Sequence, residues 1–265
     1  MKHFYSIRVI DKERDSVNIP SETAAHLQAQ GIEPQTYTFT PASRVRKTIA
    51  RRLTEASRNI PHFQLTLDVP ARELIAFRAR LNGTLGSDRK VSLNDLIVAA
   101  CATALVSHPD VNASFTEEGI VSHKSVDVSF AVAIPGGLVT PIVRDAATLP
   151  LDKLSERTRD LAQRGARMRL LPTEYVGGSF CVSNLGMFGI REFTSIINPP
   201  HGAILSVGTV EDRVVVRDGR PVVEPMMTLT LNCDHRVIDG ATGARFLSDL
   251  KTILQKPDRI EVGRG

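Results

Sequence analysis

The spacing of hydrophobic positions predicts helices and strands that are interleaved along the chain. Val45, Ile49 and Leu53 recur at i, i+4 and i+8, which predicts a helix over residues 44–57 with one apolar face. Residues 62–69 alternate in polarity and are rich in strand-forming types, so they predict a strand. The same tests predict further helices at residues 21–30, 71–81, 92–107, 151–168 and 239–254, and further strands at residues 111–115, 125–134, 178–183, 203–210 and 226–232.

Local signals at the ends of these elements refine the prediction. Ser92 stands where its side chain can cap the helix over residues 92–107, with Asp95 at the third helical position. Asp218-Gly219 is typical of a tight turn and predicts a hairpin over residues 213–223. The hairpin and the adjacent long strands indicate a mixed sheet with helices packed on it, an α/β (α+β) fold. A Rossmann fold is disfavoured, because no GxGxxG follows the first strand.

The first forty or so residues differ from the rest. They are polar and are interrupted by Pro20, Gly31, Pro34 and Pro41. Proline and glycine at such intervals are typical of loops and linkers. We therefore expect residues 1–41 to be an N-terminal extension or linker and residues 42–265 to be one large domain.

Composition narrows the class of protein. Of 265 residues, 42% are apolar and 23% are charged, which is ordinary for a globular domain and argues against disorder. The net charge of +4, from 33 basic and 29 acidic residues, is too small to indicate nucleic-acid binding. The N-terminus carries no apolar signal region, and no apolar stretch approaches the roughly 20 residues that span a bilayer. Together with cysteines that fit no metal spacing (Cys101, Cys181, Cys233), this predicts a soluble protein of the cytoplasm.

The strongest chemical signal is the segment NCDHRVIDGATGAR, residues 232–245. His235 follows a predicted strand, where a rigid backbone can project the imidazole into a cleft as a general base. Asp239 stands at the start of the next helix, where it can cap the helix, pair with an arginine, or do both. On these residues alone, a catalytic site and a structural turn both remain open.

A second signal is GGSFCVSNLGMFGI, residues 177–190, in which a strand ends at Ser183 beside a glycine-rich loop. A hydroxyl in this place can donate to an oxyanion, act as a nucleophile, or bond the loop backbone. The pattern is not GxSxG, so a nucleophile elbow is not supported.

The two segments, in this order, resemble the catalytic cores of dihydrolipoamide acyltransferases of 2-oxo acid dehydrogenase complexes. DHRVIDG resembles the active-site motif of that family, and SNLGMFGI its oxyanion-serine segment. Further matching segments follow the family's order: RKTIARRLTEASRNIPHFQLTLDV, SLNDLIVAA, VDVSFAVAIPGGLVTPIV and NPPHGAILSVG. The resemblance covers residues 41–265 and is closest to the acetyltransferase of the pyruvate dehydrogenase type.

The resemblance implies a mechanism and an assembly. His235 removes the proton of the attacking thiol, of coenzyme A or dihydrolipoamide, and Ser183 donates to the oxyanion, with no metal and no covalent acyl-enzyme. Asp239 is implied to be structural. The implied fold is like that of chloramphenicol acetyltransferase. It forms a homotrimer with histidine and serine from different subunits at each site, and such trimers can build a larger cage with other complex components.

The resemblance also places Gly137, Leu138 and Asn184 near the coenzyme A site, for which ordinary turn chemistry is the alternative. Residues 1–41 are too few for a lipoyl domain, so the lipoyl group is expected from another domain or chain. Two other functions remain open: an acyltransferase that uses a different acceptor, and a non-catalytic scaffold.

Two further features of the sequence can each be interpreted in two ways. Five basic residues in the segment RVRKTIARR indicate either a solvated helix face or a phosphate-binding one. His62, beside Pro61 at a strand start, fits a packed or capping residue better than a catalyst.

Overall fold

The computed structural model describes residues 19–86, 89–134 and 136–260. The chain divides into two compact units, Met1–Arg44 and Val45–Gly265. The first unit contains helix α1 (Ser21–Ala29), which buries none of its residues, and the short 3-10 helix η1 (Pro34–Thr36). Residues 1–18 of the predicted extension lie outside the described residues, and the predicted boundary at residue 41 stays a prediction.

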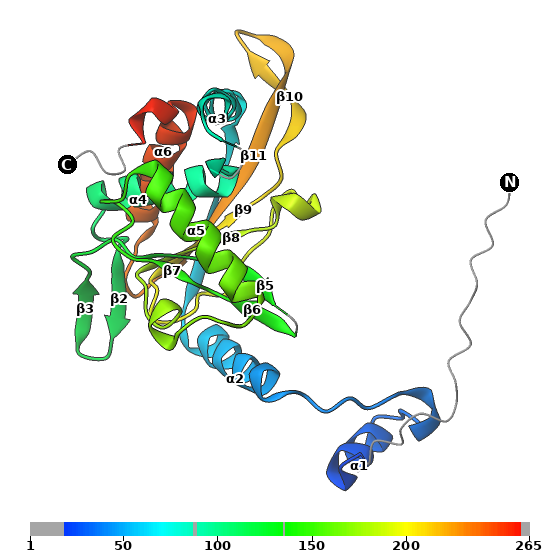
Figure 1. The fold of residues 1–265 in the computed structure, drawn as a ribbon. Helices are drawn as coiled ribbons and strands as arrows, with labels where there is room; N and C mark the ends of the chain where they lie inside the picture. Colours follow the sequence, from blue (N-terminus) through cyan, green and yellow to red (C-terminus); the bar gives the residue numbers. More distant parts are fainter. Residues whose placement is uncertain (1–18, 87–88, 135, 261–265) are drawn as a thin grey trace, which may run out of the picture. The chain divides into compact units, whose positions relative to one another are not determined.

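A seven-stranded sheet forms the centre of the second unit (Figure 1). Its strands run in the order β1-β11-β9-β8-β4-β7, and β10 pairs with β11 beyond that path. Their bounds are β1 His62–Pro70, β4 Val128–Phe130, β7 Ile142–Val143, β8 Phe180–Asn184, β9 Ala203–Val207, β10 Glu211–Arg217 and β11 Arg220–Asp234. The pairs β4–β8 and β8–β9 are parallel and the others are antiparallel, as a mixed sheet requires.

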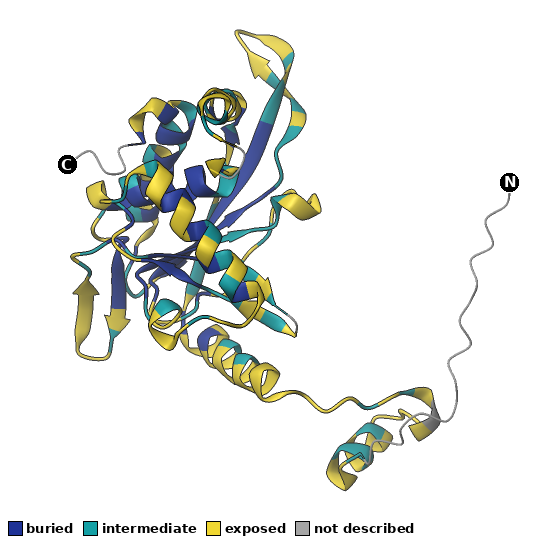
Figure 2. Cartoon of the chain, viewed as in Figure 1, coloured by how far each residue is buried: buried dark blue, intermediate teal, exposed yellow. Residues whose placement is uncertain are grey.

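Four helices bury the apolar side of this sheet: α3 Arg72–Thr84, α4 Leu93–Ser107, α5 Leu151–Ala166 and α6 Gly240–Gln255. Figure 2 shows the resulting buried layer, in which α4 and the central part of β11 are dark blue. Phe180 of β8 and Phe246 of α6 meet in this core with ring centroids 5.5 Å apart. Among the described residues, no helix is long and apolar enough to cross a membrane.

The start of α4 confirms the predicted capping box. The Asp95 amide donates to the Ser92 hydroxyl at 3.0 Å, and the Ser92 amide donates to the Asp95 carboxylate at 2.8 Å. The same carboxylate accepts from the hydroxyls of Ser155 and Thr158 on α5, at 2.9 and 2.6 Å. The buried carboxylate of Asp95 therefore caps the start of α4 and joins α4 to α5.

The opposite side of the sheet carries both polar and apolar side chains, and an irregular segment, residues 190–198, crosses it. Ser195 of this crossing segment bonds Ser206 of β9 through the two hydroxyls at 2.7 Å, and its carbonyl accepts from the Asn232 amide group at 2.8 Å. A Cβ on Gly208 would lie 1.8 Å from the Arg191 carbonyl oxygen, so the crossing requires glycine there. Helix α2 (Arg44–Asn59) packs Ala56 on this side, in a small cluster with Ile60, Cys181, Ile197 and Ile204.

The predicted single strand over residues 125–134 is wrong. It divides at Ala131 into β4 and β5 (Val132–Ile134), and β5 pairs with β6 (Gly137–Val139) in a separate two-stranded sheet. The Ala131 amide makes the last bond toward β8, to the Val182 carbonyl at 2.9 Å, after which the chain takes a new partner. The predicted break between the hairpin and the strand 226–232 is also wrong, because β11 is continuous over 15 residues.

The remaining elements are short. β2 (Ala113–Thr116) pairs with β3 (Gly119–Ser122), a strand that the hydrophobic pattern did not predict. Within the described residues, further 3-10 helices include η3 Pro172–Glu174, η4 Gly186–Phe188 and η5 Pro257–Arg259. The predicted hairpin turn is confirmed, since Asp218 and Gly219 have φ of 49° and 75°, as a type I′ turn requires.

Candidate active site

His235 lies immediately after β11, at one end of the sheet, and its side chain is exposed. Its backbone amide donates to the Pro61 carbonyl at 3.1 Å, which ties it to the segment that leads into β1. The imidazole lies against the ring of Phe63, with centroids 4.7 Å apart and planes at 52°. Within the described part of the chain the ring nitrogens make no hydrogen bond, so they are available to a substrate.

The two chain neighbours of His235, Asp234 and Arg236, form an ion pair that we did not predict from the sequence. The Arg236 guanidinium donates to the Asp234 carboxylate at 2.7 Å, and the Arg236 amide donates to the same carboxylate at 3.0 Å. Asp234 is buried, and the guanidinium stacks 4.0 Å from the centre of the Phe115 ring. The hydrogen bond and charge of Asp234 raise the pKa of Arg236. The sequence did carry a signal for this ion pair, because the opposite charges of Asp234 and Arg236 stand on either side of His235.

Asp239 caps helix α6. Its carboxylate accepts a hydrogen bond from the Thr242 amide at 2.7 Å, as the sequence allowed. That bond is the main reason that the pKa of Asp239 is lowered, and the charge of Arg245 acts in the same direction. The role of Asp239 in this geometry is to begin the helix that follows His235.

We expect Asp239→Asn to keep most of the stability and activity, because asparagine also caps helices well. Asp239→Ala removes the acceptor and should lower the thermal midpoint by about 2–4 °C. Scanning calorimetry of both variants checks this. Equal losses in the two variants would contradict a capping role and point instead to the charge.

Ser183 lies on β8 and its side chain is half-buried. Because side chains alternate along a strand, it faces the same side of the sheet as Cys181, opposite the main core. Within the described residues its hydroxyl has no hydrogen-bond partner. The loop backbone is held instead by Asn184, whose carbonyl oxygen accepts from the Gly186 amide at 2.9 Å and whose amide group donates to Asn94 at 3.2 Å. The hydroxyl is therefore free to donate to a bound group.

One chain does not bring Ser183 and His235 together. Ser183 pairs with Ser206, which pairs with Thr230 two strands away, five residues before His235. At ~3.3 Å per residue and ~4.8 Å between strands, the two positions are roughly 19 Å apart. Within one chain the two side chains therefore do not meet at one reaction centre.

Gly137 and Leu138 lie on β6, away from the seven-stranded sheet. A Cβ on Gly137 would lie 2.7 Å from the Ile49 side chain of α2, so glycine permits close packing there. Leu138 is 51% exposed. These contacts support a packing role for Gly137, and the predicted contact of both residues and Asn184 with a cofactor stays a prediction.

The cysteines are buried, as expected of small core residues. Burial raises the pKa of Cys181 and of Cys233 to about 12, and it raises the pKa of Cys101 as well. All three therefore remain thiols at neutral pH and are poor nucleophiles. Among the described residues no group of histidine, cysteine and acidic side chains is arranged to hold a metal ion.

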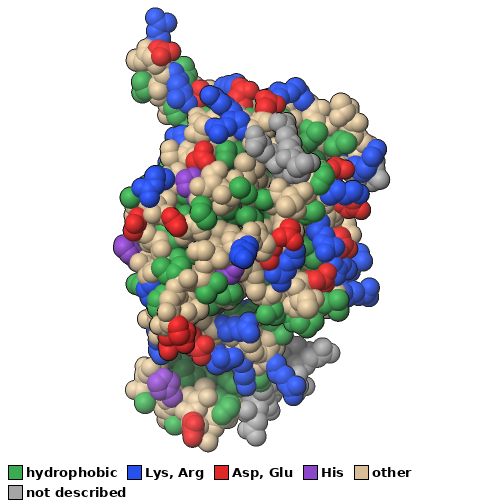
Figure 3. All heavy atoms as spheres, turned by 90° about the vertical axis from the view of Figure 1, so that its left-hand side faces the viewer, with side chains coloured by type: hydrophobic (Ala, Val, Ile, Leu, Met, Phe, Trp, Pro, Cys, Tyr) green, Lys and Arg blue, Asp and Glu red, His purple; other side chains and the backbone are tan. Residues whose placement is uncertain are grey.

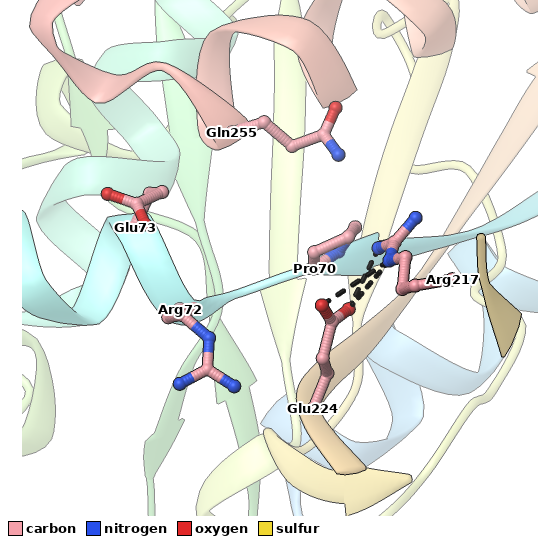
Figure 4. Close-up of a pocket in the computed structure, with 6 residues that line it drawn as sticks. All are labelled: Pro70, Arg72, Glu73, Arg217, Glu224 and Gln255. Carbon is pink, nitrogen blue, oxygen red and sulfur yellow. Dashed lines mark hydrogen bonds and ion pairs between the residues drawn. The ribbon is translucent and has the colours of Figure 1, made fainter. Parts of the chain in front are cut away.

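The pocket in Figure 4 lies away from His235. Its lining residues are Pro70, Arg72, Glu73, Arg217, Glu224 and Gln255. Glu224 precedes Asp234 by ten residues on the same strand, which corresponds to roughly 33 Å. An ion pair of 2.8 Å between Arg217 and Glu224 spans it, so the pocket is a polar recess of the hairpin base. It contains none of the predicted catalytic side chains.

His201 is buried behind the turn that ends the crossing segment. Its Nε2 lies 3.1 Å from the Ser129 hydroxyl. Burial lowers its pKa from 6.5 to about 4, although the backbone of Asn198 and of Gly177 acts in the opposite direction. The folded protein therefore holds this imidazole neutral.

We expect acid to destabilise the fold through His201. Below pH 6.5 the unfolded chain binds a proton that the folded chain excludes until about pH 4. Stability is therefore full above pH 6.5 and falls by about 3 kcal/mol as the pH drops through this window. Denaturant unfolding of the native protein and of His201→Gln at pH 7 and pH 4 checks this. If both proteins lost equal stability, His201 would not be the group responsible.

Most of the chain matches one known family of proteins. Residues 34–262 match the family described as 2-oxoacid dehydrogenases acyltransferase (catalytic domain). The chain is 45% identical over 231 residues to the dihydrolipoyllysine-residue acetyltransferase component of the pyruvate dehydrogenase complex of Rhizobium meliloti (strain 1021), covering 85% of this chain and 52% of that protein. The chain spans about half the length of the curated relatives it matches.

Solved structures share the fold. Dihydrolipoamide acetyltransferase of Azotobacter vinelandii superposes with a TM-score of 0.81 at 32% identity, covering 84% of this chain and 93% of that chain. That structure comes from work on a serine, a histidine and an asparagine in the catalytic mechanism. The cubic core of the pyruvate dehydrogenase multienzyme complex gives the same TM-score, identity and coverage. The predicted mixed sheet with flanking helices is thereby confirmed.

Proposed function

Because this chain belongs to the 2-oxoacid dehydrogenases acyltransferase family of catalytic domains, we propose that it moves an acyl group between coenzyme A and a dihydrolipoyl thiol. The observation that carries the proposal is an exposed imidazole, His235, whose ring nitrogens are unbonded within the described residues and whose backbone amide is bonded to the Pro61 carbonyl. An acetyl group is supported by the similarity to the named relatives, which are acetyltransferase components of pyruvate dehydrogenase complexes.

The chemistry follows from two side chains. A ring nitrogen of His235 takes the proton of the attacking thiol as its S–H bond breaks. The sulfur attacks the thioester carbonyl carbon, and the carbonyl oxygen becomes an oxyanion to which the Ser183 hydroxyl donates. The intermediate then collapses, the original C–S bond breaks, and the departing sulfur takes the proton back from the imidazolium. Buried, protonated cysteines fit this direct transfer, since no thiolate of the chain competes as a nucleophile.

We infer that each complete site combines two copies of the chain. His235 of one copy would meet Ser183 of the next, because the two are roughly 19 Å apart in one copy. A homotrimer, with each copy contributing to two sites, satisfies this requirement with closed symmetry. Assembly of such trimers into a cage is supported by the likeness to a cubic core. The lipoyl group would arrive on another domain or chain.

A single assay separates the candidate functions. Acetyl-, propionyl- and branched acyl-coenzyme A are each incubated with free dihydrolipoamide, and the transferred acyl group is measured. We expect transfer to the thiol, fastest with acetyl. Transfer only to an amine or alcohol acceptor would indicate a different acyltransferase, and transfer to no acceptor would indicate a scaffold.

A further inference from the structure

The short strand β2 contacts the chain beside His235. The Arg236 guanidinium lies over the ring of Phe115 on β2, with its central carbon 4.0 Å from the ring centre. Arg236 directly follows His235 in the chain. Figure 3 faces the side of the molecule on which β2 and β3 lie in Figure 1, and it shows hydrophobic and charged side chains next to one another at the surface. An aromatic side chain from a separate two-stranded sheet therefore touches the neighbour of the proposed base.

The Arg236 side chain has different partners for its N–H groups and for its positive charge. Its Nε donates to the Asp234 carboxylate at 2.9 Å, and a terminal nitrogen donates to the same carboxylate at 2.7 Å. The quadrupole of the Phe115 ring attracts the charge from another direction. A planar, delocalised guanidinium can make both kinds of contact at once, which a lysine ammonium cannot match. The two contacts together restrict the side chain to one position.

The position of Arg236 decides the state of Asp234, on the other side of His235. Asp234 is buried, and its amide donates to the Gly202 carbonyl at 2.9 Å, where β11 ends. A buried carboxylate that loses its cation is costly, so residues 234–236 would have to rearrange if the guanidinium moved away. His235 lies in the middle of these three residues. Its backbone therefore depends on the contact that holds Arg236.

Strand β2 is itself well supported. A two-stranded hairpin alone is only marginally stable in water. Here the hydroxyl of Ser114 donates to the Pro200 carbonyl, and Ser114 is buried. A Cβ on Gly202 would lie 2.3 Å from the Ala113 carbonyl oxygen, so β2 packs closely against the segment that leads into β9. Phe115 therefore projects from a fixed backbone.

We propose that Phe115 is a positioning residue for the acyl transfer: its ring holds Arg236 against Asp234 and so fixes the backbone that carries His235. This inference rests on the proposed function, because the placement of the imidazole matters only to a reaction at His235. Proton transfer depends on the placement of the base, and a small displacement costs rate. The role requires the aromatic face of Phe115 and not its apolar volume alone.

The test separates the aromatic face from the apolar volume. Phe115→Leu removes the face and keeps an apolar side chain, whereas Phe115→Tyr keeps the face. Acyl transfer from acetyl-coenzyme A to free dihydrolipoamide is measured with the full chain. We expect kcat to fall about tenfold in Phe115→Leu, with KM for acetyl-coenzyme A unchanged, and to stay native in Phe115→Tyr. Phe115 is 37% exposed, so neither change opens a cavity in the core and both proteins should fold.

Two further variants show whether the effect passes through Arg236. Ile120 pairs with Phe115 across the hairpin and is also exposed, so Ile120→Ala is the matched control and should keep native kcat. Arg236→Lys keeps the charge and loses the planar contact. In that background Phe115→Leu should cost less than twofold, because its partner is already gone. This double-mutant cycle measures the coupling of the two side chains directly.

The other outcomes would overturn the positioning role. Native kcat in Phe115→Leu would show that the ring is not needed, and an equal fall in Phe115→Tyr or in Ile120→Ala would show a general effect on the hairpin. A rise in KM with native kcat would assign Phe115 to substrate binding. A tenfold loss that persisted in the Arg236→Lys background would exclude the path through Arg236. If the native protein itself transferred no acyl group, the proposed function would fail and this inference with it.

Discussion

His235→Ala should lower acyl transfer to dihydrolipoamide by about 10²–10⁴-fold, the usual loss when a general base is removed. The fold should survive, because the exposed imidazole is not part of the core. The backbone amide at residue 235 keeps its bond to Pro61, and the Asp234–Arg236 ion pair does not involve the imidazole. Steady-state kinetics with circular dichroism and a measurement of oligomer size check both parts.

A second histidine variant serves as the matched control for His235→Ala. His26 is an exposed histidine of helix α1, in the other compact unit. His26→Ala should leave kcat unchanged. Near-normal transfer by a folded His235→Ala protein would contradict the assignment of the base.

Ser183→Ala should lower kcat by about 10²–10³-fold, as expected for the loss of one oxyanion donor. KM for acetyl-coenzyme A should change little, because the hydroxyl strengthens its bond only as negative charge develops on the carbonyl oxygen. The substitution removes no hydrogen bond from the described structure, so the unfolding free energy should be nearly unchanged. Pre-steady-state and steady-state kinetics measure the effect.

The exposed Ser122 of β3 offers the matching control. Ser122→Ala should keep full activity. If Ser183→Ala raised KM and kept kcat, the hydroxyl would bind the ground state and would not be an oxyanion donor.

Local rules predicted the ends of several elements well. Ser92 and Asp95 form their capping box, Asp239 caps α6, and Asp218-Gly219 turns the hairpin. In each case the interacting groups are within four residues, so their chemistry is encoded in adjacent letters. Strand limits failed where the partner strand decides, as at Ala131, because hydrophobic alternation carries no record of which strand lies alongside.

For the candidate site too, the sequence predicted local features and missed contacts between distant segments. Sequence patterns located His235 and Ser183 at strand ends, which the structure also shows. They did not reveal the contact of His235 with Phe63 or the fixing of His62, whose ring bonds the Ile60 carbonyl at 2.8 Å and the Ile197 amide at 3.0 Å. Such contacts depend on register between distant segments. His62 with both nitrogens bonded is a packed residue, as expected.

Complementation tests most directly whether the reaction centre is divided between copies, as we propose. His235→Ala and Ser183→Ala chains are co-expressed in equal amounts, and acyl transfer by the mixed oligomers is measured. In a closed ring with random mixing, roughly one interface in four joins an intact histidine to an intact serine, so about a quarter of native activity should return. Activity that stays at the level of the single variants, in oligomers shown to contain both chains, would contradict a site shared between copies.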